Sequence, residues 1–380
     1  MESVSPAEQL IGKKLITETR TWILEELSPK DDTVNALTTG RYSVCYRARD
    51  LDGTLGFVKI LNTYKLIEDF RSDPRQMSRA MRVFEYELEM GNICREYGLD
   101  RILSTIDDGQ YQDLDDEGNI TALPFLVFDL ASGDARSHPA SLTGRVSWNA
   151  RVLHCTAVGI RQLHETEGVH IAHNDVKASN VIVFGDSDAK LGDLGRVRRS
   201  GHDKEKLPFS KSESYTGTRE YAPPDVAANA SPNSEKAFIA IDLYQFGSLI
   251  CFIFSGIHWN VYLIRHLSQE HIPIGWNRLE KRGISGNDAY RDALTFIRDA
   301  FSKALIDLEK DLLEKYNSLI SQRILKMVKE LCEPDREKRG HPDNKFPATR
   351  EPFSLEQYIS TLDEIAIRQE IIENNQARIT

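Results

Sequence analysis

Four polar residues in a largely apolar stretch have the types and the spacing needed to transfer a phosphoryl group. Asp175 is followed by Lys177 two positions later and by Asn180 five positions later, and Asp193 comes thirteen residues after Asn180. Transfer from ATP needs a carboxylate that orients the attacking hydroxyl and accepts its proton. It also needs a lysine that neutralises charge on the transferred group, and oxygen ligands that hold Mg²⁺ against the phosphates. These four residues could supply all of these groups.

At these residues the sequence resembles the eukaryotic-type protein kinase family. The segment from His173 to Asn180 is similar to H-R-D-x-K-x-x-N, with Asn174 in place of the arginine, and the motif at Asp193 reads D-L-G where D-F-G is usual. Three later segments resemble further motifs of the family, in the family's order: GTREYAPPD (217–225), DLYQFG (242–247) and EPDREKR (333–339). The resemblance covers roughly residues 22–358, and five ordered motifs make it specific.

The resemblance implies a role for each residue of the first group. Asp175 would orient the substrate hydroxyl, and Thr218 would brace Asp175 and Lys177. Asn180 and Asp193 would bind Mg²⁺. Lys177 and Thr218 are typical of family members that phosphorylate serine and threonine rather than tyrosine. The expected activity is therefore Mg-ATP-dependent phosphorylation of protein Ser/Thr hydroxyls, including autophosphorylation.

The first half of the chain carries a looser match to the nucleotide-binding part of the family. Lys59, in GFVKIL, takes the place of the lysine that binds the α- and β-phosphates. Its partner should be an acidic residue on the following helix. Glu87 is the expected partner because Phe84-x-x-Glu87 resembles the usual surroundings of that glutamate, and Glu85 is the alternative.

The loop that covers the phosphates should lie within residues 37–46. Only Gly40 remains of the usual glycines, and Ser43 occupies another glycine position. Asp129 and Ala131, in the expected hinge, would lie beside the adenine. Phe57 stands where many family members carry a small residue over the base, so the sequence departs from the family pattern here.

Asn174 leads to a hypothesis about regulation. In many family members the arginine at this position pairs with a phosphate on the activation segment, and an asparagine cannot form that charge-assisted pair. We therefore expect activity that does not depend on this switch. The segment still contains hydroxyls that autophosphorylation could reach: Ser200, Ser210, Ser212, Ser214, Tyr215 and Thr216.

Other family-like residues are expected to support the fold rather than to react. A buried Asp242 should accept hydrogen bonds from backbone N–H groups. An ion pair between Asp225 and Arg339 should fix the helical half of the molecule. His173 is expected to pack and to hydrogen-bond within the catalytic loop rather than to act as a base.

The candidate site residues lie in a chain with a β-rich first half and a mainly helical second half. Strands are predicted at 22–27, 42–49, 56–61, 103–111 and 123–128, and a helix at 73–97 with Asp73 as its N-cap. Further helices are predicted at 147–167, from 239 onward, within 290–331 and at 355–374. Ser354 and Gln357 should form a capping box for the last of these.

The expected fold class is α+β, with the two lobes of a protein kinase. The predicted organisation is an N-terminal extension (1–21), a small lobe (22–128), a hinge (129–133), and a large lobe (134–365) with a helical insertion near 275–316. A tail (366–380) completes it.

Composition points to a globular intracellular protein. The 380 residues carry a net charge of −10, which argues against nucleic acid as the main partner. The five cysteines are scattered without a Cys-x-x-Cys pair, as in a reducing compartment. No secretory signal is visible, and the most apolar run, residues 246–257, is too short to span a bilayer, which needs about 20 residues. We expect a cytoplasmic location and no membrane partner.

Two alternatives remain open at this point. A small-molecule kinase of the aminoglycoside or choline type shares H-x-D-x-x-x-x-N but usually lacks segments like 217–225 and 242–247. A pseudokinase scaffold with weak nucleotide binding would fit the reduced glycine loop and Phe57, but not the intact Lys59, Asp175, Asn180 and Asp193.

Overall fold

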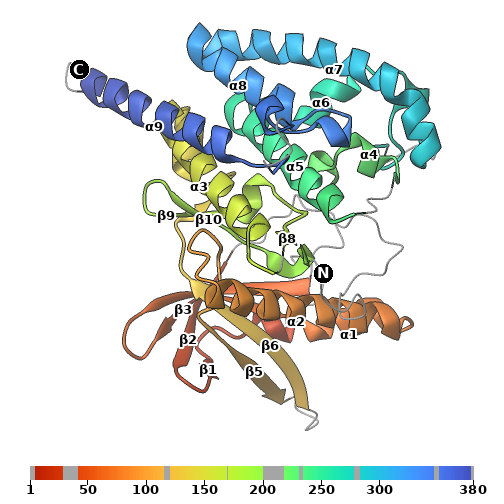
Figure 1. Cartoon of the computed structure of the whole chain (residues 1–380). Helices are drawn as coiled ribbons and strands as arrows, with labels where there is room; N and C mark the ends of the chain where they lie inside the picture. The colour runs from red at the N-terminus through yellow and green to blue at the C-terminus, as the bar shows by residue number, and fades with distance from the viewer. Residues whose placement is uncertain are drawn as a thin grey trace. The chain divides into compact units, whose positions relative to one another are not determined.

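The computed structural model describes residues 5–28, 42–114, 120–168, 170–199, 218–230, 234–277, 283–345 and 351–377 (Figure 1). Gly40 and the hydroxyl-rich segment 200–217 lie outside these residues. The described chain divides into two compact units. The β-rich unit contains the described residues up to Gly98 together with Leu103–Ala131, and the helical unit contains Leu99–Ile102 and the described residues from Ser132 onward.

The β-rich unit contains a six-stranded antiparallel sheet in the order β1-β2-β3-β4-β6-β5. Its strands are β1 (Lys14–Ile16), β2 (Thr21–Leu27), β3 (Ser43–Asp50), β4 (Leu55–Leu61), β5 (Asp107–Leu114) and β6 (Ile120–Asp129). The predicted strands at 22–27, 42–49, 56–61 and 123–128 agree closely with β2, β3, β4 and β6. The strand predicted at 103–111 begins later, at Asp107.

The segment predicted as an N-terminal extension contributes to this sheet. β1 pairs with β2, and Ala7 and Leu10 are buried in the same core as Tyr46. The Tyr46 hydroxyl donates to the carbonyl oxygen of Ala7 over 2.6 Å. Residues 5–16 therefore complete one face of the sheet.

Two helices pack on the opposite face of the sheet (Figure 1). They are α1 (Thr63–Phe70), which the sequence did not predict, and α2 (Pro74–Glu96). The Asp73 side chain accepts from the backbone N–H groups of Arg75 and Gln76, which caps α2 as expected. Leu66 and Phe84 join Leu126 and Phe128 of β6 in one apolar cluster.

The helical unit is built from six main helices and short strands. The helices are α3 (Val146–His164), α5 (Glu235–Ser255), α6 (Trp259–Ile264), α7 (Asn287–Lys315), α8 (Ser318–Leu331) and α9 (Glu356–Ala377). The short elements are α4 (Pro224–Ala227), β7 (Gly133–Asp134), β8 (Ile171–Ala172), β9 (Val181–Phe184), β10 (Asp188–Leu191) and β11 (Arg198–Arg199). The helix α3 packs against α9, and α5 packs against α8 (Figure 1). A β-rich unit and a separate helical unit confirm the predicted α+β class.

The helix α5 is longer and more apolar than the 246–257 run suggested. Its segment Lys236–Ser255 is long and apolar enough to cross a membrane. Most of this segment is buried inside the unit, and it includes the buried polar residues Asp242 and Gln245. The helix thus forms the core of the helical unit, where its polar residues face partners described below.

Two further predictions differ from the structure in the last part of the chain. Residues 366–377, predicted as a tail, continue α9. The predicted capping box is incomplete: Ser354 Oγ accepts from the N–H of Glu356, but the Gln357 side chain donates to Asn344 instead. The insertion predicted near 275–316 corresponds largely to α7.

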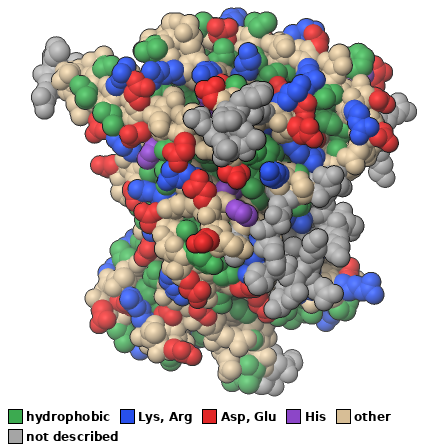
Figure 2. Space-filling model, in the orientation of Figure 1, with side chains coloured by type: hydrophobic (Ala, Val, Ile, Leu, Met, Phe, Trp, Pro, Cys, Tyr) green, Lys and Arg blue, Asp and Glu red, His purple; other side chains and the backbone are tan. Residues whose placement is uncertain are grey.

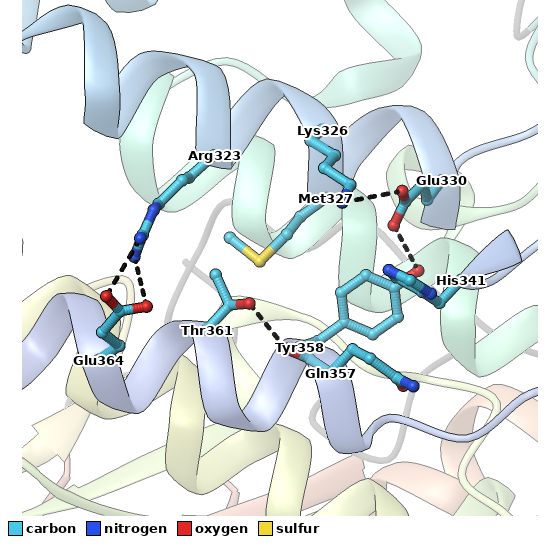
Figure 3. Close-up of a pocket in the computed structure, with 9 residues that line it drawn as sticks. All are labelled: Arg323, Lys326, Met327, Glu330, His341, Gln357, Tyr358, Thr361 and Glu364. Carbon is cyan, nitrogen blue, oxygen red and sulfur yellow. Dashed lines mark hydrogen bonds and ion pairs between the residues drawn. The ribbon is translucent and has the colours of Figure 1, made fainter. Parts of the chain in front are cut away.

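A small pocket of about 190 Å³ lies between α8 and α9 (Figure 3). An ion pair between Arg323 and Glu364 closes one end, and Tyr358 donates to Glu330 at the other. None of the predicted site residues lines this pocket. Acidic and basic side chains are interspersed over the face of the molecule shown in Figure 2.

Candidate active site

The catalytic loop runs from β8 to β9 and carries Asp175 at its centre. The Asp175 side chain is fully buried, and its carboxylate is surrounded by donors. Oδ1 accepts from both the N–H (2.8 Å) and the hydroxyl (2.9 Å) of Thr218. Oδ2 accepts from Lys177 Nζ over 2.9 Å, and Lys177 also donates to the Thr218 hydroxyl over 3.0 Å. Asp175, Lys177 and Thr218 thus form a closed triangle, as the sequence predicted.

These contacts set the charge of Asp175. Burial is the largest single influence and by itself would raise the pKa of this carboxyl, whereas the charges of Lys177 and then of Arg196 lower it. The hydrogen bonds from Lys177 and Thr218 act in the same direction, so the pKa of Asp175 lies well below its usual range. The carboxylate is therefore ionised at neutral pH and can accept a hydrogen bond from a hydroxyl.

The core helix α5 holds the loop in place through two side chains. Asp242 is fully buried and accepts from the N–H groups of His173 (2.7 Å) and Asn174 (2.6 Å). Gln245 accepts from the N–H of Val176 and donates to the carbonyl oxygen of Asn174. Asn174 has a φ of 61°, a left-handed conformation that needs such support. The expected role of Asp242 therefore matches its geometry.

The turn that carries Asp193 is tied to the same loop. Gly192 donates its N–H to the carbonyl oxygen of Asn180 over 2.8 Å, and its own carbonyl oxygen lies 3.0 Å from His173 Nε2. Asp193 itself has a φ of 61°. His173 is fully buried, which fits the structural role expected of it. Strained backbone at two functional positions, Asn174 and Asp193, is typical of a pre-formed catalytic site.

Asn180 and Asp193 fit the ligand chemistry of Mg²⁺. Asn180 uses its amide Nδ2 to donate to the carbonyl oxygen of Asp175 over 2.9 Å, which leaves its Oδ1 as an oxygen ligand. Asp193 adds a half-buried carboxylate. The described residues contain no group of three or more His, Cys, Asp or Glu that could hold a metal. Two oxygen ligands suit Mg²⁺, which is usually bound by one or two carboxylates together with substrate phosphates and water.

Lys59 and Glu87 meet in the β-rich unit. Lys59 lies on β4 and Glu87 on α2, and Nζ donates to both carboxylate oxygens over 2.8 and 2.6 Å. Both side chains are largely buried, with 12% and 5% of their surfaces exposed. Glu85, the alternative partner, is exposed. The geometry therefore selects Glu87.

The remaining described nucleotide-site predictions lie on or next to strands of the same sheet. Ser43 begins β3, and its buried Oγ has no hydrogen-bond partner among the residues that the structure describes. Asp129 is the exposed last residue of β6, and Ala131 lies two residues further along the chain. Phe57 is half-buried on β4, directly opposite Phe128 on β6. Gly40 lies outside the described residues.

Two charged contacts were not foreseen. Arg196 directly follows the D-L-G motif, and its Nε lies 3.9 Å from Asp175 Oδ2. Asp225 binds the predicted Arg339 over 2.5 Å and also Arg336, whose Nε donates over 2.8 Å. In the sequence, only the position of Arg336 within EPDREKR indicated that it could bind Asp225. For Arg196, the indication was that a basic residue directly follows the metal motif.

Comparisons with known proteins give a consistent picture. A family model described as the protein kinase domain matches residues 125–345. A serine/threonine-protein kinase-like protein of Arabidopsis thaliana is 32% identical over 120 residues, 31% of this chain and 24% of its own length. A cysteine-rich receptor-like protein kinase of the same plant is 30% identical over 142 residues, 37% of this chain and 20% of its own length.

A longer match is more distant. A G-type lectin S-receptor-like serine/threonine-protein kinase of Arabidopsis thaliana is 25% identical over 227 residues, which cover 59% of this chain and 24% of that protein. The chain therefore matches about a quarter or less of the length of each of these relatives.

Proposed function

Since the chain belongs to the protein kinase family, we propose that it transfers the γ-phosphoryl group of ATP to serine and threonine hydroxyls of proteins, itself included. The resemblance to the eukaryotic-type family that the sequence motifs indicated is confirmed by the match over residues 125–345. The observation that carries the proposal is the triangle of Asp175, Lys177 and Thr218, in which Lys177 and Thr218 both donate hydrogen bonds to the carboxylate and Lys177 also donates to Thr218.

Four residues of the helical unit would each have a separate role in the transfer. The ionised Asp175 would accept the hydrogen bond of the attacking hydroxyl, orient it and take its proton. Lys177, held between Asp175 and Thr218, would place a positive charge beside the transferred group. When bound, Mg²⁺ supplies positive charge against the phosphate oxygens. Asn180 and Asp193 would hold it.

In the β-rich unit, Lys59 would bind phosphate oxygens of the nucleotide. A buried lysine needs a counter-charge, and the two short hydrogen bonds to Glu87 supply it and fix the ammonium in one position. An ammonium fixed in this way can bind a phosphate without first being ordered.

The position of Phe57 favours a second candidate function: a scaffold that binds nucleotide but does not transfer phosphate. Phe57 and Phe128 place two aromatic rings directly opposite each other on neighbouring strands, on the sheet face that also carries Lys59. These rings would alter the fit of an adenine base. Because the relatives are named protein kinases and residues 217–225 are present, we do not propose a small-molecule substrate.

The test is transfer of labelled phosphate from ATP with Mg²⁺ to the protein itself and to a generic basic protein. Asp175→Asn and Asp193→Asn should abolish labelling of serine and threonine, whereas Asp288→Asn, at a largely exposed carboxylate on α7, should not. Label that persists in the first two variants would contradict the proposal. Nucleotide binding without any label in the wild-type protein would favour the scaffold.

We also propose that this domain works in the cytoplasm. ATP is abundant there, and the reducing conditions suit five cysteines that form no disulfide, all of which lie among the described residues. Fractionation of cells that express the tagged full chain would test the location. Recovery in a secreted fraction would contradict it.

A further inference from the structure

Arg196 is a nearly buried arginine to which the proposed transfer reaction assigns no role. Only 10% of its side chain is exposed, and its Nε lies 3.9 Å from Oδ2 of the fully buried Asp175. A guanidinium is always charged and is costly to bury without a partner. Its position therefore depends on the catalytic carboxylate, and this contact joins two segments that are separate in sequence.

The contact completes the attachment of the turn that carries Asp193. Before Asp193, Gly192 is bound to the catalytic loop through Asn180 and His173. After Asp193, the short 3₁₀ helix Leu194–Arg196 ends with the arginine that reaches Asp175. Asp193, with its left-handed backbone, thus lies between two attachments to one loop.

The electrostatics around Asp175 leave a distinct place for Arg196. Among the described residues, Lys177 and Arg196 are the two cations within 4.0 Å of this carboxylate. Lys177, Thr218 and, over a longer 3.5 Å, the Asn180 amide donate hydrogen bonds to it, so Arg196 adds attraction without being needed to satisfy an oxygen. Asn174, which precedes Asp175, is uncharged, and its amide donates to the carbonyl oxygen of Ala172. The attraction between Arg196 and Asp175 acts on both partners, so it holds the end of the turn beside the loop as well as stabilising the carboxylate.

We propose that Arg196 is a positioning residue: it fixes the Asp193 turn to Asp175 from within the chain, so that the site is assembled without a phosphate on residues 200–217. This inference rests on the proposed function, because the turn it fixes would hold Mg²⁺. It predicts that metal affinity and the rate of transfer depend on Arg196, whereas removal of phosphate from the protein changes neither.

The experiment compares the full-length wild type with Arg196→Met and Arg196→Lys, and with Arg291→Met at an exposed position on α7 as control. Binding of a fluorescent ATP analogue is titrated with Mg²⁺, and kcat and KM are measured on a peptide. Arg196→Met should raise the half-saturating Mg²⁺ concentration about tenfold. It should lower kcat about 10- to 100-fold with KM for the peptide nearly unchanged.

The conservative variant separates positioning from general loss of structure. Arg196→Lys keeps the charge with a shorter reach and should recover most of the rate, with a Mg²⁺ shift of only about two- to threefold. It also tests the proposal if Arg196→Met does not fold. A Mg²⁺ requirement and a kcat that stay within twofold of wild type in Arg196→Met would overturn the proposal, as would an Arg196→Lys variant no better than Arg196→Met.

Two further outcomes separate this inference from the proposed function. Wild-type protein treated with phosphatase should keep its activity, and a large loss would overturn the claim that the site assembles without phosphate. If the wild type labels no substrate, the proposed function fails, but Mg²⁺-dependent nucleotide binding still tests Arg196. An unchanged Mg²⁺ requirement in Arg196→Met would then overturn the inference by itself.

Discussion

In the helical unit, the loop that carries Asp175 is held through its backbone groups, whereas in the β-rich unit the Lys59 side chain is held by one ion pair. The side chains of Asp242 and Gln245 bind the loop around Asp175 through four hydrogen bonds to its backbone atoms. The pair of Lys59 and Glu87 depends on the placement of α2 against β4. The proposed chemistry of the helical unit therefore depends on how the loop folds onto α5, and the proposed phosphate binding by Lys59 depends on the position of α2.

The largest expected effect comes from removing the carboxylate that holds the loop. Asp242→Ala leaves two buried N–H groups and the ring of His164 without their acceptor. We expect a loss of about 3–5 kcal/mol in the free energy of unfolding, together with loss of transfer. Urea denaturation measures the first and phosphate transfer the second, with Asp288→Ala as a surface control. A stable variant with full activity would show that the loop does not depend on α5.

The ion pair in the β-rich unit should affect both activity and stability. Lys59→Met should lower kcat/KM about 100-fold, because one proposed phosphate ligand is lost. It should also lower the melting temperature, because the buried Glu87 carboxylate loses its partner. Glu87→Gln keeps the shape of the glutamate but removes its charge, and should lower kcat/KM about tenfold. Steady-state kinetics and thermal melting distinguish these effects.

A double-mutant cycle sharpens this prediction. In the double variant Lys59→Met, Glu87→Gln, the loss should equal that of Lys59→Met alone, since the glutamate would act only through the lysine. Additive losses would mean that Glu87 has a separate role.

The sequence predicted most of the helical-unit site because its residues lie close together along the chain. Asp175, Lys177 and Asn180 fall within one loop, and their spacing alone indicated the chemistry. Arg196 was missed as a partner because its contact with Asp175 depends on the left-handed backbone of Asp193, which no local pattern shows.

The β-rich unit shows where local patterns fail. Residues 5–16 have no strong strand pattern, yet Ala7, Leu10 and Leu15 fill one face of the sheet, a tertiary effect that burial dictates. The choice between Glu85 and Glu87 likewise needed the direction of α2, because both acids lie on the same helix and only Glu87 points inward.

Close packing of α5 against α8 gives a smaller test in the helical unit. A Cβ added at Gly247 would lie 2.6 Å from Cys332 Sγ and 2.7 Å from Leu331 Cβ, which is too close without movement of a helix. Gly247→Ala should cost about 1–3 kcal/mol in the free energy of unfolding. The neighbouring Ser248→Ala is a matched control: its buried hydroxyl has no partner among the described residues, so its loss should be neutral or slightly stabilising. Equal losses in both variants would contradict this account of the helix contact.

The smallest expected effect concerns Cys45 in the β-rich unit. It lies directly opposite Lys59 on the adjoining strand, so both side chains share the proposed nucleotide face, and it is only half-buried. Burial raises the pKa of Cys94 and of Cys251 to about 12, so these thiols should stay unreactive toward iodoacetamide at pH 8.

Cys45 should therefore be the first cysteine alkylated, as followed by mass spectrometry of tryptic peptides. ATP with Mg²⁺ should slow its alkylation about two- to fivefold by covering the face, since a thiolate reacts only when the reagent can reach it. Asp193→Asn should weaken this protection, because less Mg²⁺ would be held with the nucleotide, while leaving alkylation in the absence of nucleotide unchanged. Equal protection in Asp193→Asn would show that nucleotide reaches the face of β3 and β4 without help from the metal turn.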